Sequence, residues 1–142
     1  MIHKRYASDF MTGQVIVANV NNTFDQVMEF FTKHKIQHLP VASDQRLIGI
    51  ISIKDMLRYI NESLESGESF TRDSLKSGFH IDKVMTPNPI AVQRTAPQKE
   101  VLEILSTVKF QAVPVLEGNE IVGIITNKDI TRLYHYDATH IL

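Results

Sequence analysis

Hydrophobic and polar residues follow the same order twice along this chain. Shifting the sequence by 74 positions places residues 11–60 over 85–134 without a gap, and 15 of the 50 aligned pairs are identical. The clearest copies are GIISIKD at 49–55 and GIITNKD at 123–129, and most of the other pairs exchange like for like. A repeat of this length predicts two halves that share one fold.

Each half begins with a pattern typical of a short strand followed by a helix. The strand candidates are the apolar stretches 15–20 and 89–92. A capping-box spacing follows in each half, at Thr23 with Gln26 and at Thr95 with Gln98. Apolar residues then recur at helical spacing and predict one buried stripe per helix, formed by Phe24, Val27, Met28 and Phe31 and by Val101, Leu102, Leu105 and Val108.

The remainder of each half predicts a hairpin and a second helix. Two apolar stretches contain a proline, which favours a sheet edge or a strand start, and they are 38–42 and 112–116. Polar turns follow, and then the buried strands 47–52 and 121–126. The second helices begin near Ser52 and Thr126. The order of elements is therefore β-α-β-β-α in both halves.

The repeat predicts an α+β fold in which two pseudo-symmetric β-α-β-β-α repeats pack as one module. A single unit of about 50 residues leaves part of its sheet uncovered, and a second unit can cover it. The second helix of the first repeat should reach about Glu65, and one short helix should follow in the polar linker. The expected organisation is repeat 1 at 8–62, the linker at 63–82, repeat 2 at 83–136 and a tail at 137–142.

Composition and charge narrow the classes of function. The chain has 15 basic and 16 acidic residues, so no overall basic field favours nucleic-acid binding. The absence of cysteine excludes disulfides and cysteine-based zinc or nucleophilic sites. The first residues lack the apolar core of a secretory signal, and no apolar run approaches the roughly 18 residues of a membrane span. We therefore expect a cytoplasmic protein without membrane insertion.

The repeated GII-hydroxyl-x-x-Asp pattern has two interpretations. In the structural one, Ser52 with Asp55 and Thr126 with Asp129 form capping boxes at the starts of the second helices. In the functional one, each helix start binds a phosphate through its free N–H groups and positive dipole end. The aspartate, one turn into the helix, accepts hydrogen bonds from a ribose diol.

Other residues near the repeated pattern fit the functional interpretation. Gly49 and Gly123 leave room for close approach of a ligand or a backbone. Four basic side chains could neutralise a phosphate, although each alone is equally typical of a solvated helix face, and they are Lys54, Arg58, Lys128 and Arg132.

In this order and spacing, the motifs resemble a tandem pair of cystathionine β-synthase (CBS) domains, also called a Bateman module. The matching pieces are MTGQVIV and MTPNPIAV, then HLPV and AVPV, then GIISIKD and GIITNKD, and the resemblance covers about 10–134. It implies a non-catalytic protein that binds AMP, ADP or ATP, or alternatively S-adenosylmethionine or NAD, in clefts between the two repeats.

The resemblance also implies which residues would contact the ligand. The hydroxyl-x-x-Asp pairs would contact phosphate and ribose, and Lys128 and Arg132 would add charge. Backbone around Thr12–Ile16 and around Thr86, Pro89 and Ile90 would hold the base. The residues before and at the central prolines line the same cleft, namely His38, Pro40, Ala112 and Pro114. The second site is preferred, because Val15 stands in the first half where the second has Pro89.

The six histidines and the other reactive side chains give little sign of an enzyme or a metal site. His34 should end a helix and Pro40 follows His38, so these two histidines are not expected to share a helical face as metal ligands. His38 is a candidate phosphate contact. His135 and His140 lie in the tail, where disorder or an interface is expected. No nucleophile–base pair and no phosphate-loop motif is present.

Three hypotheses follow. The leading one is a ligand-sensing regulatory module that binds an adenine nucleotide and signals by conformational change to a protein effector in trans. The second is a dimerisation module with empty clefts, and the third is a small nucleotide hydrolase. We also expect a homodimer, because Phe30 and Phe31 are adjacent and the second helix of the first half carries apolar residues around its whole circumference, including Met56, Leu57, Tyr59 and Ile60.

Overall fold

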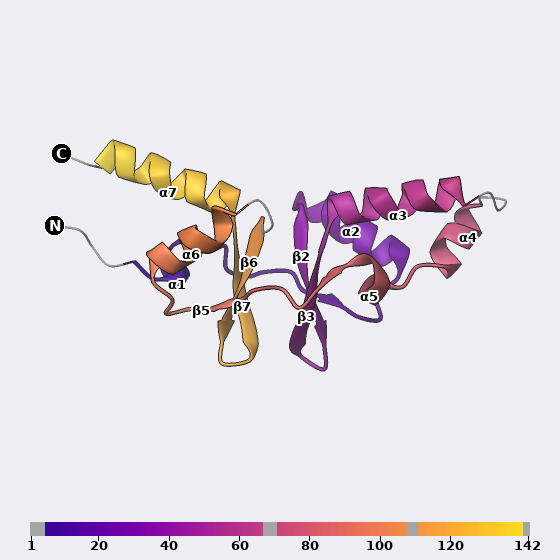
Figure 1. Ribbon diagram of the computed structural model, residues 1–142, viewed down its shortest axis with the longest axis horizontal. Coiled ribbons are helices and arrows are strands. Elements are labelled where there is room, and N and C mark those ends of the chain that lie inside the picture. Colours follow the sequence, from indigo (N-terminus) through magenta and orange to yellow (C-terminus); the bar gives the residue numbers. More distant parts are fainter. Residues whose placement is uncertain (1–4, 67–70, 108–110, 141–142) are drawn as a thin grey trace. The chain divides into compact units, whose positions relative to one another are not determined.

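The structure is a computed structural model that describes residues 5–66, 71–107 and 111–140 (Figure 1). The described residues form two compact units. The central unit consists of residues 16–89, and the terminal unit combines the described residues before 16 with those after 89. The segment that begins each repeat therefore lies in the unit built by the other repeat.

The central unit holds a four-stranded sheet in the order β1-β2-β3-β4. Strand β1 is parallel to β2, and the two other pairs are antiparallel. Its elements are β1 (Ala18–Asn19), α2 (Phe24–His34), β2 (His38–Ser43), β3 (Arg46–Ser52), α3 (Ile53–Glu65), α4 (Arg72–Ser77), α5 (Ile81–Val84) and β4 (Thr86–Pro87).

The terminal unit holds a three-stranded sheet in the order β5-β6-β7, with β5 parallel and β7 antiparallel to β6. Thr12 adds an isolated antiparallel bridge to Ile124 of β7. Its elements are α1 (Ala7–Phe10), β5 (Val92–Gln93), α6 (Gln98–Leu105), β6 (Ala112–Glu117), β7 (Glu120–Thr126) and α7 (Asn127–His140). Both units thus contain the predicted β-α-β-β-α order, and the α+β prediction is confirmed.

Both hairpins use two-residue turns that suit their sequences. In the β2–β3 turn, Asp44 and Gln45 have φ values of 49° and 66°, which is the left-handed pair of a type I′ turn. In the β6–β7 turn, Gly118 takes the left-handed conformation with φ 62°. Turns of this kind match the twist of the flanking strands, so each hairpin closes tightly and its register is defined.

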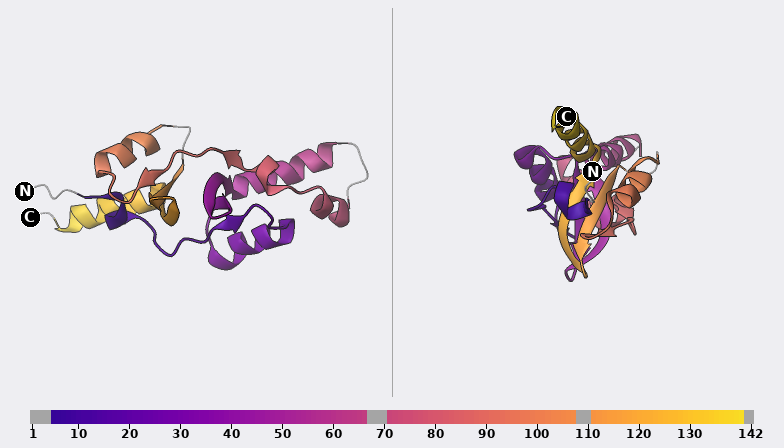
Figure 2. Two further views of the ribbon diagram at one scale, coloured as in Figure 1. Left: turned by 90° about the horizontal axis from the view of Figure 1, so that it is seen from below. Right: turned by 90° about the vertical axis from the view of Figure 1, so that its left-hand side faces the viewer.

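Each unit has its own apolar core on one face of its sheet. Figures 1 and 2 show α2 and α3 on the same face of the β2–β3 hairpin, and α6 and α7 on the same face of the β6–β7 hairpin. Most of the fully buried side chains come from the two hairpins and from the helices that cover them. Examples are Leu39, Val41, Ile51 and Val27 in the central unit and Val113, Val115, Ile125 and Val101 in the terminal unit.

The structure corrects two predictions about the first strand and helix of each half. The strands predicted at 15–20 and 89–92 pair over two residues only, at β1 and β5. The Thr23 capping box is present, but the one predicted at Thr95 is wrong, because α6 starts after Pro97 and has no side-chain cap. A residue before proline disfavours the helical conformation, so Ala96 keeps the chain extended and the helix cannot begin earlier.

Other predictions of element positions are confirmed. Helix α2 ends at His34 and α3 ends at Glu65, as expected. Two short helices then follow, α4 and α5, where the sequence predicted one. Pro40 and Pro114 lie on stretches of β2 and β6 that β1 and β5 do not reach, so no ladder donor is missing there. Val108 lies outside the described residues. None of the described helices combines the length and apolar character needed to cross a membrane.

Candidate functional site: a buried aspartate at the start of one helix in each unit

In the central unit, Ser52 and Asp55 form a reciprocal capping box at the start of α3. The Asp55 amide donates to Ser52 Oγ at 3.1 Å, and the Ser52 amide donates to Asp55 Oδ2 at 2.8 Å. Ser52 Oγ also donates to Asp55 Oδ2 at 3.0 Å. The other carboxylate oxygen, Oδ1, accepts from Arg58 Nη2 at 2.8 Å. The structural interpretation of the repeated pattern is therefore correct for this helix.

In the terminal unit, Asp129 has the same position at the start of α7. Its Oδ2 accepts from the Thr126 amide at 2.9 Å and from Thr126 Oγ1 at 3.4 Å. Its Oδ1 accepts from Arg132 Nη1 at 3.1 Å and from Thr12 Oγ1 at 2.7 Å. The contact with Thr12 joins residues 117 positions apart.

Burial sets these two aspartates apart from ordinary capping residues. Asp55 is 7% exposed and Asp129 is 2% exposed, and they are the buried charged residues among the described positions. A capping carboxylate works equally well in water, whereas burying a carboxylate is costly unless hydrogen bonds and an opposite charge satisfy it. Arg58 and Arg132 supply that charge while their own side chains stay more than half exposed.

The two helix starts differ in the backbone donors they leave for a ligand. In the central unit, the Ile53 amide donates to the Gln37 carbonyl and the Asp55 amide donates to Ser52, so two of the first three N–H groups are used. The described residues show no equivalent partner for the Asn127 and Asp129 amides of α7. The expectation of free donors is therefore better met in the terminal unit.

The repeated glycines, Gly49 and Gly123, leave room for the methionines of the pairs Met85-Thr86 and Met11-Thr12. We call residues 5–12 and 79–86 the head segments. A Cβ at Gly49 would collide with the Met85 side chain, and one at Gly123 would collide with the Met11 side chain. Each glycine thus admits a methionine from the head segment of the other repeat. The sequence predicted close approach of a ligand or a backbone, and such a backbone neighbour is found at Gly123, in the Thr12 carbonyl oxygen.

Both head segments lead into a left-handed residue. Gln14 has φ 49° and Asn88 has φ 50°, and the 74-residue shift places one on the other. Left-handed conformations are unfavourable for residues other than glycine, least so for asparagine. Their occurrence at equivalent places shows that both segments turn in the same way just after the Thr12 and Thr86 pairings. Sequence reasoning missed this turn.

The structure distributes the other predicted site residues over the two units. His38 is paired with Ser52, and Ala112 with Thr126, at the ends of the hairpins where α3 and α7 begin. Lys54 and Lys128 are exposed. The segments expected to hold the base are divided by the unit boundary: Thr12 and Ile90 belong to the terminal unit, and Ile16, Thr86 and Pro89 to the central unit.

The terminal unit has a pocket beside Asp129. It has a volume of about 300 Å³ and runs along α7, between that helix and the first head segment. Asp129 and Arg132 line one end, and Arg5 and Tyr136 line the other. A ligand that reaches Asp129 from this side would meet the guanidinium of Arg132.

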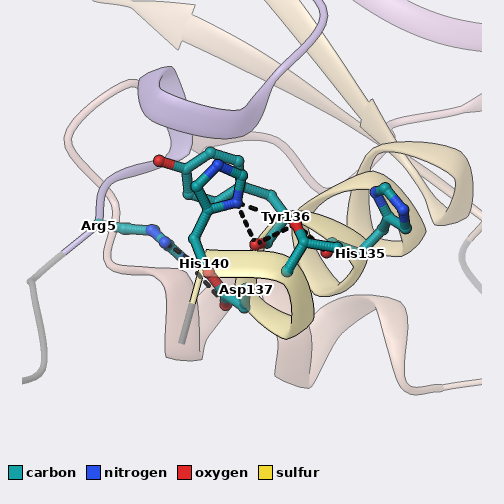
Figure 3. Close-up of polar contacts among 6 residues, drawn as sticks. Arg5, His135, Tyr136, Asp137 and His140 are labelled. Carbon is teal, nitrogen blue, oxygen red and sulfur yellow. Dashed lines mark hydrogen bonds and ion pairs between the residues drawn. The ribbon is translucent and has the colours of Figure 1, made fainter. Parts of the chain in front are cut away.

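An ionic clamp, formed by Arg5 and Asp137, attaches the first head segment to α7. The guanidinium donates two hydrogen bonds to the carboxylate, of 2.8 and 2.6 Å, and these bonds hold the pKa of Asp137 below its usual value. Arg5 Cζ also lies 5.9 Å from the centroid of the Tyr136 ring, which stacks on His140 at 4.0 Å. Figure 3 shows this group on the last turns of α7, with His135 pointing away from it.

The structure corrects the expectation of disorder at His135 and His140, whereas the alternative expectation of an interface there stays a prediction. Helix α7 continues to His140, whose Nδ1 is 2.8 Å from the Tyr136 carbonyl oxygen. The predicted domain boundaries themselves stay a prediction. No local sequence signal pairs Arg5 with Asp137, because the two residues are 132 positions apart.

Comparison with known proteins identifies the family. The family model of the CBS domain matches twice, at residues 7–62 and 81–136. The chain therefore belongs to the CBS-domain family and contains two CBS domains in tandem. No catalytic family is indicated by this match.

Relatives and solved structures agree with this assignment. The chain is 27% identical to protein MJ1225 of Methanocaldococcus jannaschii over 128 residues, which are 89% of this chain and 46% of that protein. The solved structure of MJ1225 is similar with a TM-score of 0.80, over 92% of this chain and 48% of that one. The CBS domain pair of protein MJ0100, solved in complex with 5′-methylthioadenosine and S-adenosyl-L-methionine, is 26% identical, with a TM-score of 0.79 over 95% and 99% of the two chains. The chain spans less than half the length of the first curated relatives that it matches.

Proposed function

We propose that this CBS pair is a regulatory module that binds an adenosine-containing ligand, with AMP, ADP or ATP as the first candidates. The observation that carries the proposal is the buried aspartate in each unit. Its negative charge is retained at the same place in both repeats, although a hydrogen-bonded neutral side chain could cap the helix at lower cost. A fixed carboxylate at a helix start is suited to accept both hydroxyls of a ribose.

The ligand class follows from the groups around the aspartate. A ribose diol is shared by AMP, ADP and ATP and by the two ligands named with the MJ0100 domain pair. Lys54, Lys128 and the exposed parts of Arg58 and Arg132 place positive charge near each helix start, which favours a phosphate over an uncharged tail. S-adenosylmethionine and NAD remain the alternative ligands, and His38 is a further proposed phosphate contact.

The central test removes each carboxylate. Replacing Asp129 or Asp55 by alanine should weaken AMP binding at that site by roughly tenfold to a hundredfold, equal to about 1.5–3 kcal/mol, because the diol loses a charged acceptor. Calorimetric titration would measure this loss. Asp73→Ala, an exposed aspartate in the first turn of α4, changes the net charge equally and should leave the affinity unchanged.

Altered ligands test which chemical groups of the nucleotide the aspartates and the basic side chains bind. In the parent protein, 2′-deoxy-AMP should bind much more weakly than AMP, and Asp129→Ala should lose little further for it, because both changes delete one interaction. Adenosine and 5′-methylthioadenosine should bind less tightly than AMP if the basic side chains hold a phosphate. Equal affinities of the parent and both aspartate variants for every ligand would contradict the proposal.

A second candidate function, association of two copies, rests on an apolar groove on α3. Leu57 and Leu64 are 61% and 52% exposed, and with Ile60 they follow one another at helical spacing along the groove. Exposed apolar patches of this kind mark interfaces. Light scattering should therefore give a dimer for the parent and a monomer for Leu57→Asp. Thr131→Asp, at the equivalent position of α7, is the matched control, and a parent monomer at high micromolar concentration would contradict this function.

We further propose that ligand binding alters how the module contacts a protein effector in trans. Only a ligand with different affinity for two states can shift their populations, so the proposal requires a ligand-dependent change. Hydrogen exchange at α3 and α7 with and without AMP would measure it, and a cytoplasmic setting would supply the nucleotide.

A further inference from the structure

We propose that Thr12 is an affinity-determining residue, whose hydroxyl competes with the ligand for the Asp129 carboxylate, so that the Asp55 site fills first. This inference rests on the proposed function. It reverses the preference for the second-half motif that the sequence suggested and that the backbone donors of α7 support, because the hydrogen bonds that each carboxylate already accepts rank the two sites in the opposite order.

The two carboxylates differ in one acceptor position. An ionised carboxylate has about four lone-pair sites, two on each oxygen. On Asp129, Oδ2 accepts twice from Thr126, and Oδ1 accepts from Arg132 and from Thr12. All four sites are used, so a ribose hydroxyl can bond to Asp129 only by displacing one of these donors.

Three hydrogen bonds from described residues reach the Asp55 carboxylate, so one of its four acceptor sites has no donor within the part of the chain that the structure describes. Its Oδ2 accepts from the Ser52 amide and hydroxyl, and its Oδ1 accepts from Arg58. The equivalent of Thr12 is Thr86, which is paired with Ile50 as Thr12 is with Ile124. Within the described ranges, however, Thr86 donates no hydrogen bond to Asp55, and a ribose hydroxyl can therefore bond to Oδ1 without displacing any of the three donors above.

Thr12 is the donor that gives way at Asp129. Two backbone hydrogen bonds with Ile124, of 2.9 and 3.0 Å, hold its main chain, so only rotation of its side chain is needed. The residue is exposed, and a released hydroxyl can bond to water instead. The bond from Arg132 is charge-assisted, and those from Thr126 close the helix start, so both cost more to break. The Thr12 hydroxyl is an uncharged donor, so exchanging its bond for one from the ribose should lower the affinity only about two- to tenfold.

The test isolates each site and changes only the competing hydroxyl. In an Asp55→Ala background, which leaves the Asp129 site, Thr12→Val should tighten AMP binding about two- to tenfold in calorimetric titration. Thr12→Ser keeps the hydroxyl and should give no such gain. In an Asp129→Ala background, Thr86→Val should likewise give no gain at the Asp55 site. In the parent protein, the tighter of two binding steps should be the one lost in Asp55→Ala.

The outcomes separate this inference from the proposed function. If the Asp55→Ala protein binds AMP and Thr12→Val leaves the affinity equal or lower, Thr12 is not a competitor, and the proposed function stands without it. The same conclusion holds if Thr86→Val tightens the other site as much. Thr12→Ala replaces the valine variant if valine disturbs the bridge to Ile124, as hydrogen exchange of the Thr12 and Ile124 amides would reveal. If no variant and no parent protein binds AMP or 5′-methylthioadenosine, both proposals are wrong.

Discussion

The two head segments follow equivalent paths but are attached by different chemistry. In the central unit, Phe79 packs against Phe24 and Tyr59, with ring centroids 5.7 and 5.4 Å apart and the rings nearly perpendicular. In the terminal unit, Arg5 stands at the equivalent position and forms the ionic clamp with Asp137. One segment is held by a buried aromatic cluster and the other by a partly exposed ion pair.

This difference teaches that the backbone pairing, rather than a particular side chain, is the shared feature. Equivalent residues are paired in the two units: Thr86 lies opposite Ile50 of β3, and Thr12 lies opposite Ile124 of β7. The attachment upstream can then diverge, with consequences for stability. The stability from apolar burial depends little on ionic strength or pH. A partly exposed ion pair, in contrast, weakens as ionic strength rises and as the carboxylate is protonated at low pH.

The largest expected effect comes from removing the aromatic attachment. Phe79 is 7% exposed, and Phe79→Ala should lower the free energy of unfolding by about 3–5 kcal/mol, because it deletes a ring from a packed core. Urea denaturation would measure the loss. Arg5→Ala, at the equivalent place in the terminal unit, should cost far less, and equal losses in the two variants would contradict the comparison.

The next effect concerns the glycines that admit the methionines. At Gly123, a Cβ would meet both the Met11 side chain and the Thr12 carbonyl oxygen, which lies 3.0 Å away. At Gly49, the three atoms nearest to a Cβ all belong to the flexible Met85 side chain. Gly123→Ala should therefore cost about 1–3 kcal/mol of stability, since backbone cannot move aside easily, and Gly49→Ala should cost less. Thermal unfolding of both variants tests the order, and a larger loss for Gly49→Ala would show that the methionine is the more rigid neighbour.

Much of the fold of both units could be predicted from the sequence, because the patterns that define its elements are local. The repeat, the helix stripes, the hairpins and the Ser52–Asp55 box all depend on residues a few positions apart. The crosswise placement of the head segments could not be predicted, since it pairs Thr12 with a strand more than a hundred positions away and no periodicity encodes that. The Thr95 box failed for a local reason as well, because the pattern was weighed without the restriction that Pro97 imposes on Ala96.

In the candidate site, too, some features could be predicted from local spacing and others could not. The aspartates and their hydroxyl partners were found from spacing alone, but their burial and the Thr12 bond to Asp129 required the fold. The sequence favoured the second site because it has Pro89 where the first has Val15, in a segment expected to hold the base through its backbone. We propose to rank the two sites instead by the acceptor site that the described residues leave open on Asp55, which depends on where a distant threonine lies.

The smallest expected effect is the pH dependence of the ionic clamp. The hydrogen bonds from Arg5 lower the pKa of Asp137 in the folded state, with a smaller contribution from the charge of His140. A carboxyl group with a lowered folded pKa contributes stability above its unfolded pKa, near 4, and loses that contribution as pH falls through the folded value. The clamp should thus stabilise the terminal unit at pH 7 and no longer do so in strong acid.

The measurement compares the parent with Arg5→Gln, because other carboxylates also titrate in this range. Thermal unfolding should give a lower midpoint for Arg5→Gln at pH 7, and the difference between the two proteins should shrink steadily below pH 4. High salt at pH 7 should reduce the same difference, since the pair is partly exposed. Asp137→Asn should behave like Arg5→Gln, and the double variant should add little to either, because both changes remove one interaction. A difference that persists unchanged at pH 2 would mean that Arg5 holds the head segment through Tyr136 and packing rather than through the carboxylate of Asp137.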